Sequence, residues 1–220
     1  MTSDAALPHG GAYAQGRVAC EFCEKMEPSD REWFDFHILH ADADFITVAC
    51  LGAIVPGYLM ILPRQHTLSM ASVTAAEHEG LATYLQFIAS VQAQAWAYPT
   101  IFEHGSCGQI RSGVIGSCIS HAHWHLVPGD FALAGGLAGF RTVSSIREIR
   151  SVPRPDGYLM YWNSEGIFVN TTDHPPSQYF RHILSSRVGL DDQWDYLVFP
   201  FLDNVRETID RFQEVASRNI

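Results

Sequence analysis

The sequence predicts a mixed fold in which short antiparallel strands are combined with helices, and three observations carry this prediction. Apolar runs of strand-forming composition at 33–39, 45–49 and 58–62 are separated by turn sequences at 42–44 and 55–57, which is typical of an antiparallel meander. A long amphipathic stretch with helical periodicity follows them. Further along, a short run alternates histidine with apolar residues, which is the two-residue period of a strand.

The amphipathic stretch begins at a capping box, Thr74-Ala75-Ala76-Glu77, and ends before Pro99. Its apolar side chains recur at helical spacing along one face: Leu81, Leu85, Ile88, Val91 and Trp96. We expect this stripe to face the core rather than a cofactor.

The alternating run is His121-Ala122-His123-Trp124-His125-Leu126-Val127-Pro128. In a strand, all three histidines lie on one face, and the residues between them lie on the other, in the core. Imidazole titrates near neutrality, so this face is suited to proton transfer, nucleophilic attack or metal ligation.

A fourth strand is predicted at 100–105, followed by a glycine-rich loop at 106–120. Glu103 and His104 in this strand could orient a catalytic group or could equally form a surface ion pair. Arg111 lies in the loop, whose free backbone N–H groups could bind an anion beside the histidines.

Composition narrows the class of protein. The chain has 220 residues, a formal net charge of −10 and 14 lysines and arginines, which argues against broad binding to nucleic acid. It has no apolar run long enough to span a bilayer, and its start lacks the features of a signal peptide. We therefore expect a cytoplasmic protein that does not bind membranes.

Cys20-Glu21-Phe22-Cys23 is the pattern of half a metal site or of a redox pair. No second Cys-x-x-Cys follows, so the remaining ligands of a metal would have to be histidines. A glycine-rich segment precedes the motif where a thioredoxin-like site would have a strand, and this favours a structural metal.

The chain divides into a tail at 1–19, a domain at 20–130 and an extension at 131–220. After a Gly- and Ala-rich connector, the extension contains a hairpin at 158–169 and two helices. We expect it to pack on the preceding domain or on a dimer mate. Arg181 and His182 could reach a substrate, but we interpret them as part of a solvated helix face.

These segments together resemble the histidine triad superfamily. The histidine run resembles the family's His-φ-His-φ-His-φ-φ signature, where φ is apolar, and residues 55–66 resemble its Pro-Gly-His-x-Leu-Val-x-Pro-Lys-x-His segment. The likeness covers about residues 18 to 130. It implies an α+β fold with a five-stranded antiparallel sheet, usually paired into a homodimer, and hydrolysis or transfer at the α-phosphorus of a nucleotide-containing substrate.

The resemblance assigns roles to particular residues. His123 becomes the nucleophile, which forms a nucleotidyl-imidazole intermediate, and His125 contacts the phosphoryl or leaving-group oxygens. A structural zinc ion is implied, held by Cys20, Cys23, His66 and His121. Members with glutamine at the third position tend to be transferases or phosphorylases, so His125 favours a hydrolase.

Some positions depart from the family's pattern. Cys50 stands where an Asp or Asn often holds the ribose hydroxyls, and Tyr58 stands where a histidine is common. Ser117 replaces a glutamine that reaches the phosphate, although its hydroxyl can still donate one hydrogen bond. Gly129 replaces a frequent arginine. The substrate is therefore expected to be held differently, with Cys50, Glu103, His104 and Arg111 as candidate binding residues.

Three functions stay open on the sequence. The first is a nucleotidyl hydrolase, or a transferase of the same superfamily, that acts through His123 on a dinucleoside polyphosphate, phosphoramidate or nucleotidyl ester. The second is a metal-dependent enzyme whose three histidines bind one catalytic ion. The third is a non-catalytic nucleotide-binding module.

Overall fold

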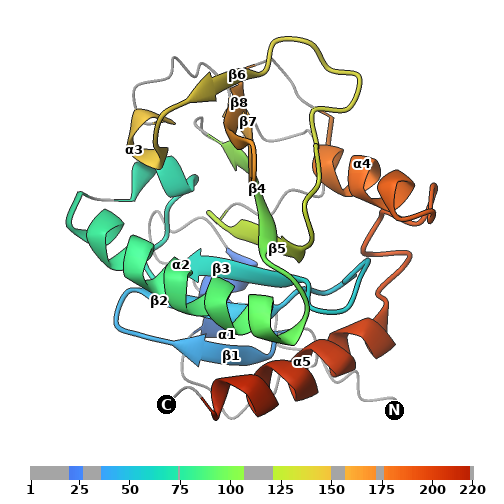
Figure 1. The fold of residues 1–220 in the computed structure, drawn as a ribbon. Helices are drawn as coiled ribbons and strands as arrows, with labels where there is room; N and C mark the ends of the chain where they lie inside the picture. Colours follow the sequence, from blue (N-terminus) through green and yellow to red (C-terminus); the bar gives the residue numbers. More distant parts are fainter. Residues whose placement is uncertain are drawn as a thin grey trace, which may run out of the picture.

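The computed structural model describes residues 20–26, 36–73, 75–106, 121–149, 157–171 and 176–218, with the backbone alone at 75–78 and 106. Its centre is one antiparallel sheet with strands in the order β1-β2-β3-β5-β4-β7-β8-β6 (Figure 1). The strands are β1 Ile38–Ala41, β2 Phe45–Ala49, β3 Leu59–Pro63, β4 Pro99–Ser106, β5 Trp124–Pro128, β6 Arg141–Val143, β7 Gly157–Asn163 and β8 Gly166–Asn170.

The predicted meander is confirmed in β1, β2 and β3. β2 and β3 pair in register from Phe45 opposite Pro63 to Ala49 opposite Leu59, and both strands are buried along their whole length. The first strand is shorter than expected, because among the described residues of 33–39 only the last two are extended into the ladder. Residues 33–35 lie outside the part of the chain that the structure describes.

The expected five-stranded sheet is wrong, because the sheet has eight strands. The eight-residue strand β4 pairs with β5 along one edge and with β7 along the other, where Ile101 lies opposite Trp162. The hairpin β7–β8 and then β6 continue the sheet outward from β4. Backbone N–H and C=O groups on the second edge of β4 need partners, and the C-terminal hairpin supplies them.

One face of the sheet is covered by α2, Ala75–Ala95, as the helical periodicity predicts. The stripe residues Leu81, Leu85, Ile88 and Val91 are buried in one core cluster with Trp124 and Leu126. The predicted capping box at 74–77 lies outside the side chains that the structure describes. This helix therefore fixes which face of β5 is core and which is left for the site.

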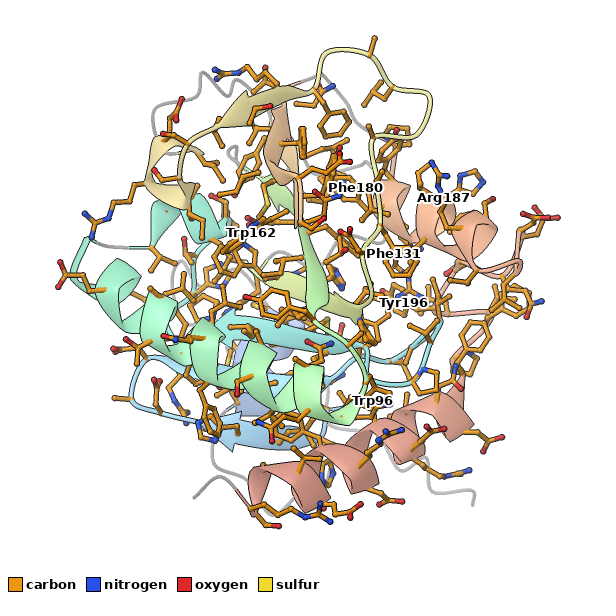
Figure 2. The ribbon with its side chains drawn as sticks, viewed as in Figure 1. Trp96, Phe131, Trp162, Phe180, Arg187 and Tyr196 are labelled. Atoms are coloured by element: carbon orange, nitrogen blue, oxygen red, sulfur yellow. The ribbon has the colours of Figure 1, made fainter. Side chains whose placement is uncertain are left out.

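The other helices are α1 Glu21–Met26, the 3-10 turn η1 Met70–Ser72, α3 Ile146–Ile149, α4 Tyr179–Arg187 and α5 Leu202–Ala216. α5 packs beside α2 at the β1–β2 end of the sheet, with Trp96 near their contact (Figures 1 and 2). α4 follows the hairpin and contributes Phe180 and Leu184 to a second core cluster on the face opposite α2. Within the described residues, no helix is long and apolar enough to cross a membrane.

The hairpin predicted in the extension is confirmed, with Asn163 paired to Gly166 across a two-residue turn. The two predicted helices of the extension are also confirmed as α4 and α5. The extension therefore shares its sheet and its second core cluster with the residues before 131.

Candidate functional site

The three histidines lie at the start of β5. The strand begins at Trp124, later than predicted, so His125 lies within it and His121 and His123 precede it. The chain before the strand is held by a hydrogen bond from the Ala122 N–H to the Thr67 carbonyl, at 2.7 Å. The predicted two faces are confirmed, since Ala122, Trp124 and Leu126 all lie in the core cluster beneath α2.

His123 has one ring nitrogen fixed by its own backbone. Its Nδ1 lies 2.7 Å from the carbonyl oxygen of His121, and a carbonyl only accepts, so Nδ1 carries the proton. Burial lowers the pKa of His123, although the bond to the carbonyl raises it. The neutral ring therefore keeps a lone pair on Nε2, and the ring of Phe22 packs edge-on against it with centroids 5.8 Å apart.

His125 has the opposite arrangement. It stacks on Phe102 of the neighbouring strand, with ring centroids 4.6 Å apart, and its Nδ1 lies 3.0 Å from the Tyr58 hydroxyl. Tyr58 is completely buried, and its hydroxyl contacts Nδ1 of His125 and the guanidinium of Arg181, which can only donate. The hydroxyl therefore donates to Nδ1, because otherwise its proton would be buried without an acceptor. His125 is then left with a proton on Nε2.

The pKa of His125 lies well below its ordinary value. Burial is the main cause, and the nearby guanidinium of Arg181 lowers the pKa further. Neighbouring His104 has its pKa lowered to about 4, again mainly by burial. Both rings are therefore neutral at pH 7, and His125 acts as a hydrogen-bond donor rather than as a cation.

His121 belongs to a different cluster. Its Nδ1 lies 3.5 Å from the sulfur atoms of both Cys20 and Cys23, and the Cys23 sulfur lies 3.3 Å from Nδ1 of His66. All four candidate ligand atoms lie within 4.8 Å of one another. The four residues that the resemblance assigns to a metal are thus brought together.

These residues fit a zinc ion. Bonds of about 2.3 Å to sulfur and about 2.0–2.1 Å to nitrogen give tetrahedral ligand separations of roughly 3.3–3.8 Å, and the sulfur–nitrogen distances above agree. His121 donates from Nε2 to the Pro63 carbonyl at 2.8 Å, which leaves Nδ1 available as a ligand and orients the ring. His123 and His125 are not part of this group, so the three histidines do not converge on one ion.

A pocket opens on the face of the sheet opposite α2. His123, His125 and His104 line its floor, α1 lines one wall, and α4 with the segment after it lines another. Phe180 and Tyr196 come from this last wall (Figure 2). The full lining is Glu21, Phe22, Lys25, Cys50, Leu51, Met60, Phe102, His104, His123, His125, Gln178, Tyr179, Phe180, Arg181, Tyr196 and Leu197.

The other candidate residues are placed as follows. Cys50 and His104 line the pocket. Glu103 lies on the opposite face, where it accepts hydrogen bonds from Met70 N–H, Trp124 Nε1 and the Tyr158 hydroxyl, so it is a buried structural carboxylate. Arg111 and Ser117 lie outside the described residues.

Two residues that line the pocket, Phe102 and Arg181, were not identified from the sequence. Phe102 shares a face of β4 with His104, so the two-residue period could have identified it. Arg181, interpreted as part of a solvated face, is only 4% exposed and lines the pocket, and that interpretation is wrong. The segment that covers it lies more than ten residues further along, where no local pattern indicates it. His182 is exposed, as expected.

Comparisons with known proteins give partial matches to solved structures. No protein-family model matches the chain, and no curated protein sequence matches it. A zinc-bound histidine triad family protein from Mycobacterium smegmatis is 19% identical over 60% of this chain and 91% of its own, with a TM-score of 0.39. A HIT-like protein involved in cell-cycle regulation from Bartonella henselae is 15% identical over 49% and 75%, with a TM-score of 0.36. A HIT family hydrolase from Legionella pneumophila is 21% identical over 54% and 98%, with a TM-score of 0.35.

Proposed function

We propose that this protein is a divergent histidine triad enzyme that hydrolyses nucleotide conjugates at the α-phosphorus through a nucleotidyl-His123 intermediate. The observation that carries the proposal is the hydrogen bond of 2.7 Å from His123 Nδ1 to the His121 carbonyl. It leaves Nε2 of a neutral imidazole, at the floor of a pocket, with a free lone pair. Such a ring is a competent nucleophile near pH 7 without a separate base.

The reaction is proposed in two displacements. Nε2 of His123 attacks the α-phosphorus, and the bond from phosphorus to the leaving group breaks. The Nε2–H of His125 donates a hydrogen bond to a phosphoryl oxygen, whose negative charge grows during the attack. Water then attacks the phosphorus, the phosphorus–nitrogen bond breaks, and its electron pair returns to Nε2 of His123. The water gives up a proton to solvent, and solvent supplies the proton that the leaving group takes up, so the products are a nucleoside monophosphate and the protonated leaving group.

We propose zinc as the ion of the Cys20–Cys23–His66–His121 cluster, in a structural role. Two thiolates and two imidazoles close a tetrahedral site and leave no position for a substrate. The bound ion would hold α1 and the start of β5 in one place, and the chain's own histidines would perform the chemistry. Thiolate ligands also fit a reducing compartment such as the cytoplasm.

The test is rapid-quench mass spectrometry with AMP, GMP and CMP conjugates, together with the variant His123→Ala. We expect a nucleotidyl adduct on His123 in the wild type. The variant should keep one zinc per chain and lose turnover by at least about a thousandfold, because removal of a nucleophile leaves only binding. Exposed His37, replaced by Ala, is the matched control and should behave like the wild type.

Other outcomes assign the other functions. An adduct that is consumed faster by an acceptor such as phosphate than by water identifies a transferase or phosphorylase. Nucleotide binding with no adduct and no turnover of any conjugate identifies a binding module. Loss of the metal in His123→Ala would contradict the separation of the two sites.

A further inference from the structure

Arg181 brings a buried positive charge to the pocket from the C-terminal extension. It is 4% exposed, and three of its donors are directed at neutral acceptors. Nε donates to the Trp194 carbonyl at 2.9 Å, Nη2 donates to the Gly52 carbonyl at 2.6 Å, and Nη1 lies 3.9 Å from the Cys50 sulfur. The guanidinium also donates to the Tyr58 hydroxyl and lies over the rings of Tyr58 and Tyr196.

No carboxylate pairs with this charge among the residues that the structure describes. Cys50 does not neutralise it either, because burial raises the pKa of the thiol to about 11 in spite of the guanidinium. A buried charge normally requires an opposite charge, and since the described residues supply none beside Arg181, we infer that the partner comes from a ligand.

The rest of the pocket lining contributes no net charge. Lys25 and Glu21 form an ion pair at 2.6 Å, and His104 and His125 are neutral at pH 7. Arg181 is therefore the uncompensated charge of the described lining, in a chain whose formal net charge is −10. A positively charged pocket in an acidic protein favours the binding of an anion in that pocket.

The backbone at Gly52 lies close to the guanidinium of Arg181. Gly52 has a φ of +72°, and a Cβ at this position would lie 2.8 Å from Nη2 of Arg181 and 2.4 Å from Cβ of Tyr196. Only glycine permits this approach. The loop after β2 and the segment after α4 thus hold the guanidinium in one orientation, beside the Tyr58–His125 pair.

We propose that Arg181 binds a phosphate group of the substrate and is the main charge that distinguishes a nucleotide from a nucleoside in this pocket. This inference rests on the proposed function, since it assigns the anion to the nucleotide that His123 attacks. A planar guanidinium suits phosphate oxygens. Because the groups that now accept its hydrogen bonds are neutral, a phosphate can contact the guanidinium without breaking an ion pair.

The first test compares binding of AMP, GMP and CMP with binding of the corresponding nucleosides by calorimetry. We expect the wild type to prefer at least one nucleotide over its nucleoside. In Arg181→Met this preference should fall about ten- to a hundredfold, which is the worth of hydrogen bonds to a charged group. Arg187→Met is the matched control, because it removes an exposed charge from the same helix (Figure 2) and should keep the preference.

The second test keeps Arg181 and places an opposite charge beside it. Cys50→Asp places a carboxylate beside Nη1, and Cys50→Asn places a neutral group of similar shape there. We expect the nucleotide preference of Cys50→Asp to fall at least about tenfold below that of Cys50→Asn. If Arg181→Met does not fold, the comparison of these two Cys50 variants still tests whether Arg181 binds the phosphate.

The outcomes separate the two proposals. A folded Arg181→Met with unchanged nucleotide preference, or equal preferences in the two Cys50 variants, overturns the role of Arg181 and leaves the His123 chemistry standing. Wild-type protein that binds no nucleotide overturns both. A nucleotidyl adduct on His123 without any preference for nucleotide over nucleoside overturns the role of Arg181 alone.

Discussion

Two histidines that are two residues apart have opposite proton arrangements, and their neighbours determine this. His123 meets a backbone carbonyl and keeps its Nδ1 proton, whereas His125 meets the Tyr58 hydroxyl and keeps its Nε2 proton. One ring therefore presents a lone pair to the pocket and the other presents a donor. A nucleophile and an electrophile are thus produced from the same side chain through neutral hydrogen-bond partners.

Tyr58→Phe tests this arrangement. Without the hydroxyl, either nitrogen of His125 can carry the proton, so the donor toward the phosphoryl oxygen is present only part of the time. We expect kcat for a nucleotide conjugate to fall about fivefold, since a hydrogen bond of this kind is worth about 1 kcal/mol, while KM changes less than twofold. Steady-state kinetics of the zinc-loaded variant measures both. Tyr98→Phe, at an exposed tyrosine, is the control, and a rise in KM alone would contradict the positioning role.

His104 gives the protein a dependence of stability on pH. Its pKa is about 4 in the folded state because of burial, and about 6.5 when the chain unfolds. Between these values the unfolded state binds the proton and the folded state does not, so stability falls as the pH drops from 6.5 to 4. In His104→Gln the slope should decrease by up to about 1.4 kcal/mol per pH unit. Urea unfolding at pH 7, 6 and 5 measures it, and parallel curves for the two proteins would exclude this role.

At the level of elements, the short helix α1 connects the metal cluster with the pocket. Cys20 and Cys23 flank the first turn, and between them Glu21 and Phe22 face the pocket. Six residues cannot form a stable isolated helix, so its position depends on the ligands at its start. The metal site therefore determines the shape of one pocket wall.

Removal of the metal should consequently weaken substrate binding before it affects the chemistry. In Cys23→Ser we expect zinc content to fall below about a tenth of the wild-type value and nucleotide affinity to fall about tenfold, as α1 leaves the wall. Metal analysis and calorimetry measure the two effects. Chelation of the wild type followed by added zinc is the control for reversibility, and equal affinity with and without metal would refute the coupling.

Elements that depend on residues close together in the chain could be predicted from the sequence. Side-chain periodicities of 2.0 and 3.6 residues and turn sequences predict the meander, α2 and the hairpin, and the structure confirms them. The pairing of β4 with β7 joins Phe102 to Tyr161, far apart in the chain, and no local pattern specifies such a partner. Arg181 was misjudged for the same reason, because its burial comes from Gly52 and the Trp194 carbonyl, in two other segments.

At the scale of the whole molecule, one continuous sheet contains strands from both the segment before residue 131 and the C-terminal extension. Both sides of β4 are paired within the chain, and in the described structure only β1 and β6 have a single neighbour. The homodimer implied by the resemblance stays a prediction, and continuation of the sheet into a second copy would have to use β1 or β6. The pocket needs no second copy for its described walls, because α1 and α4 supply them.

The boundary expected at residue 130 can be tested by truncation. A chain that ends there loses β7, which pairs with β4 over six positions, and loses the side chains of Leu159, Phe180 and Leu184 from the second core cluster. Several buried apolar side chains removed at about 2 kcal/mol each exceed the stability of an ordinary domain. We expect the truncated protein to be unfolded or aggregated by circular dichroism and light scattering, and the full chain to unfold in urea in one transition seen equally by fluorescence and circular dichroism. A folded 20–130 fragment that keeps zinc would show that the extension is an independent addition rather than part of one cooperative unit.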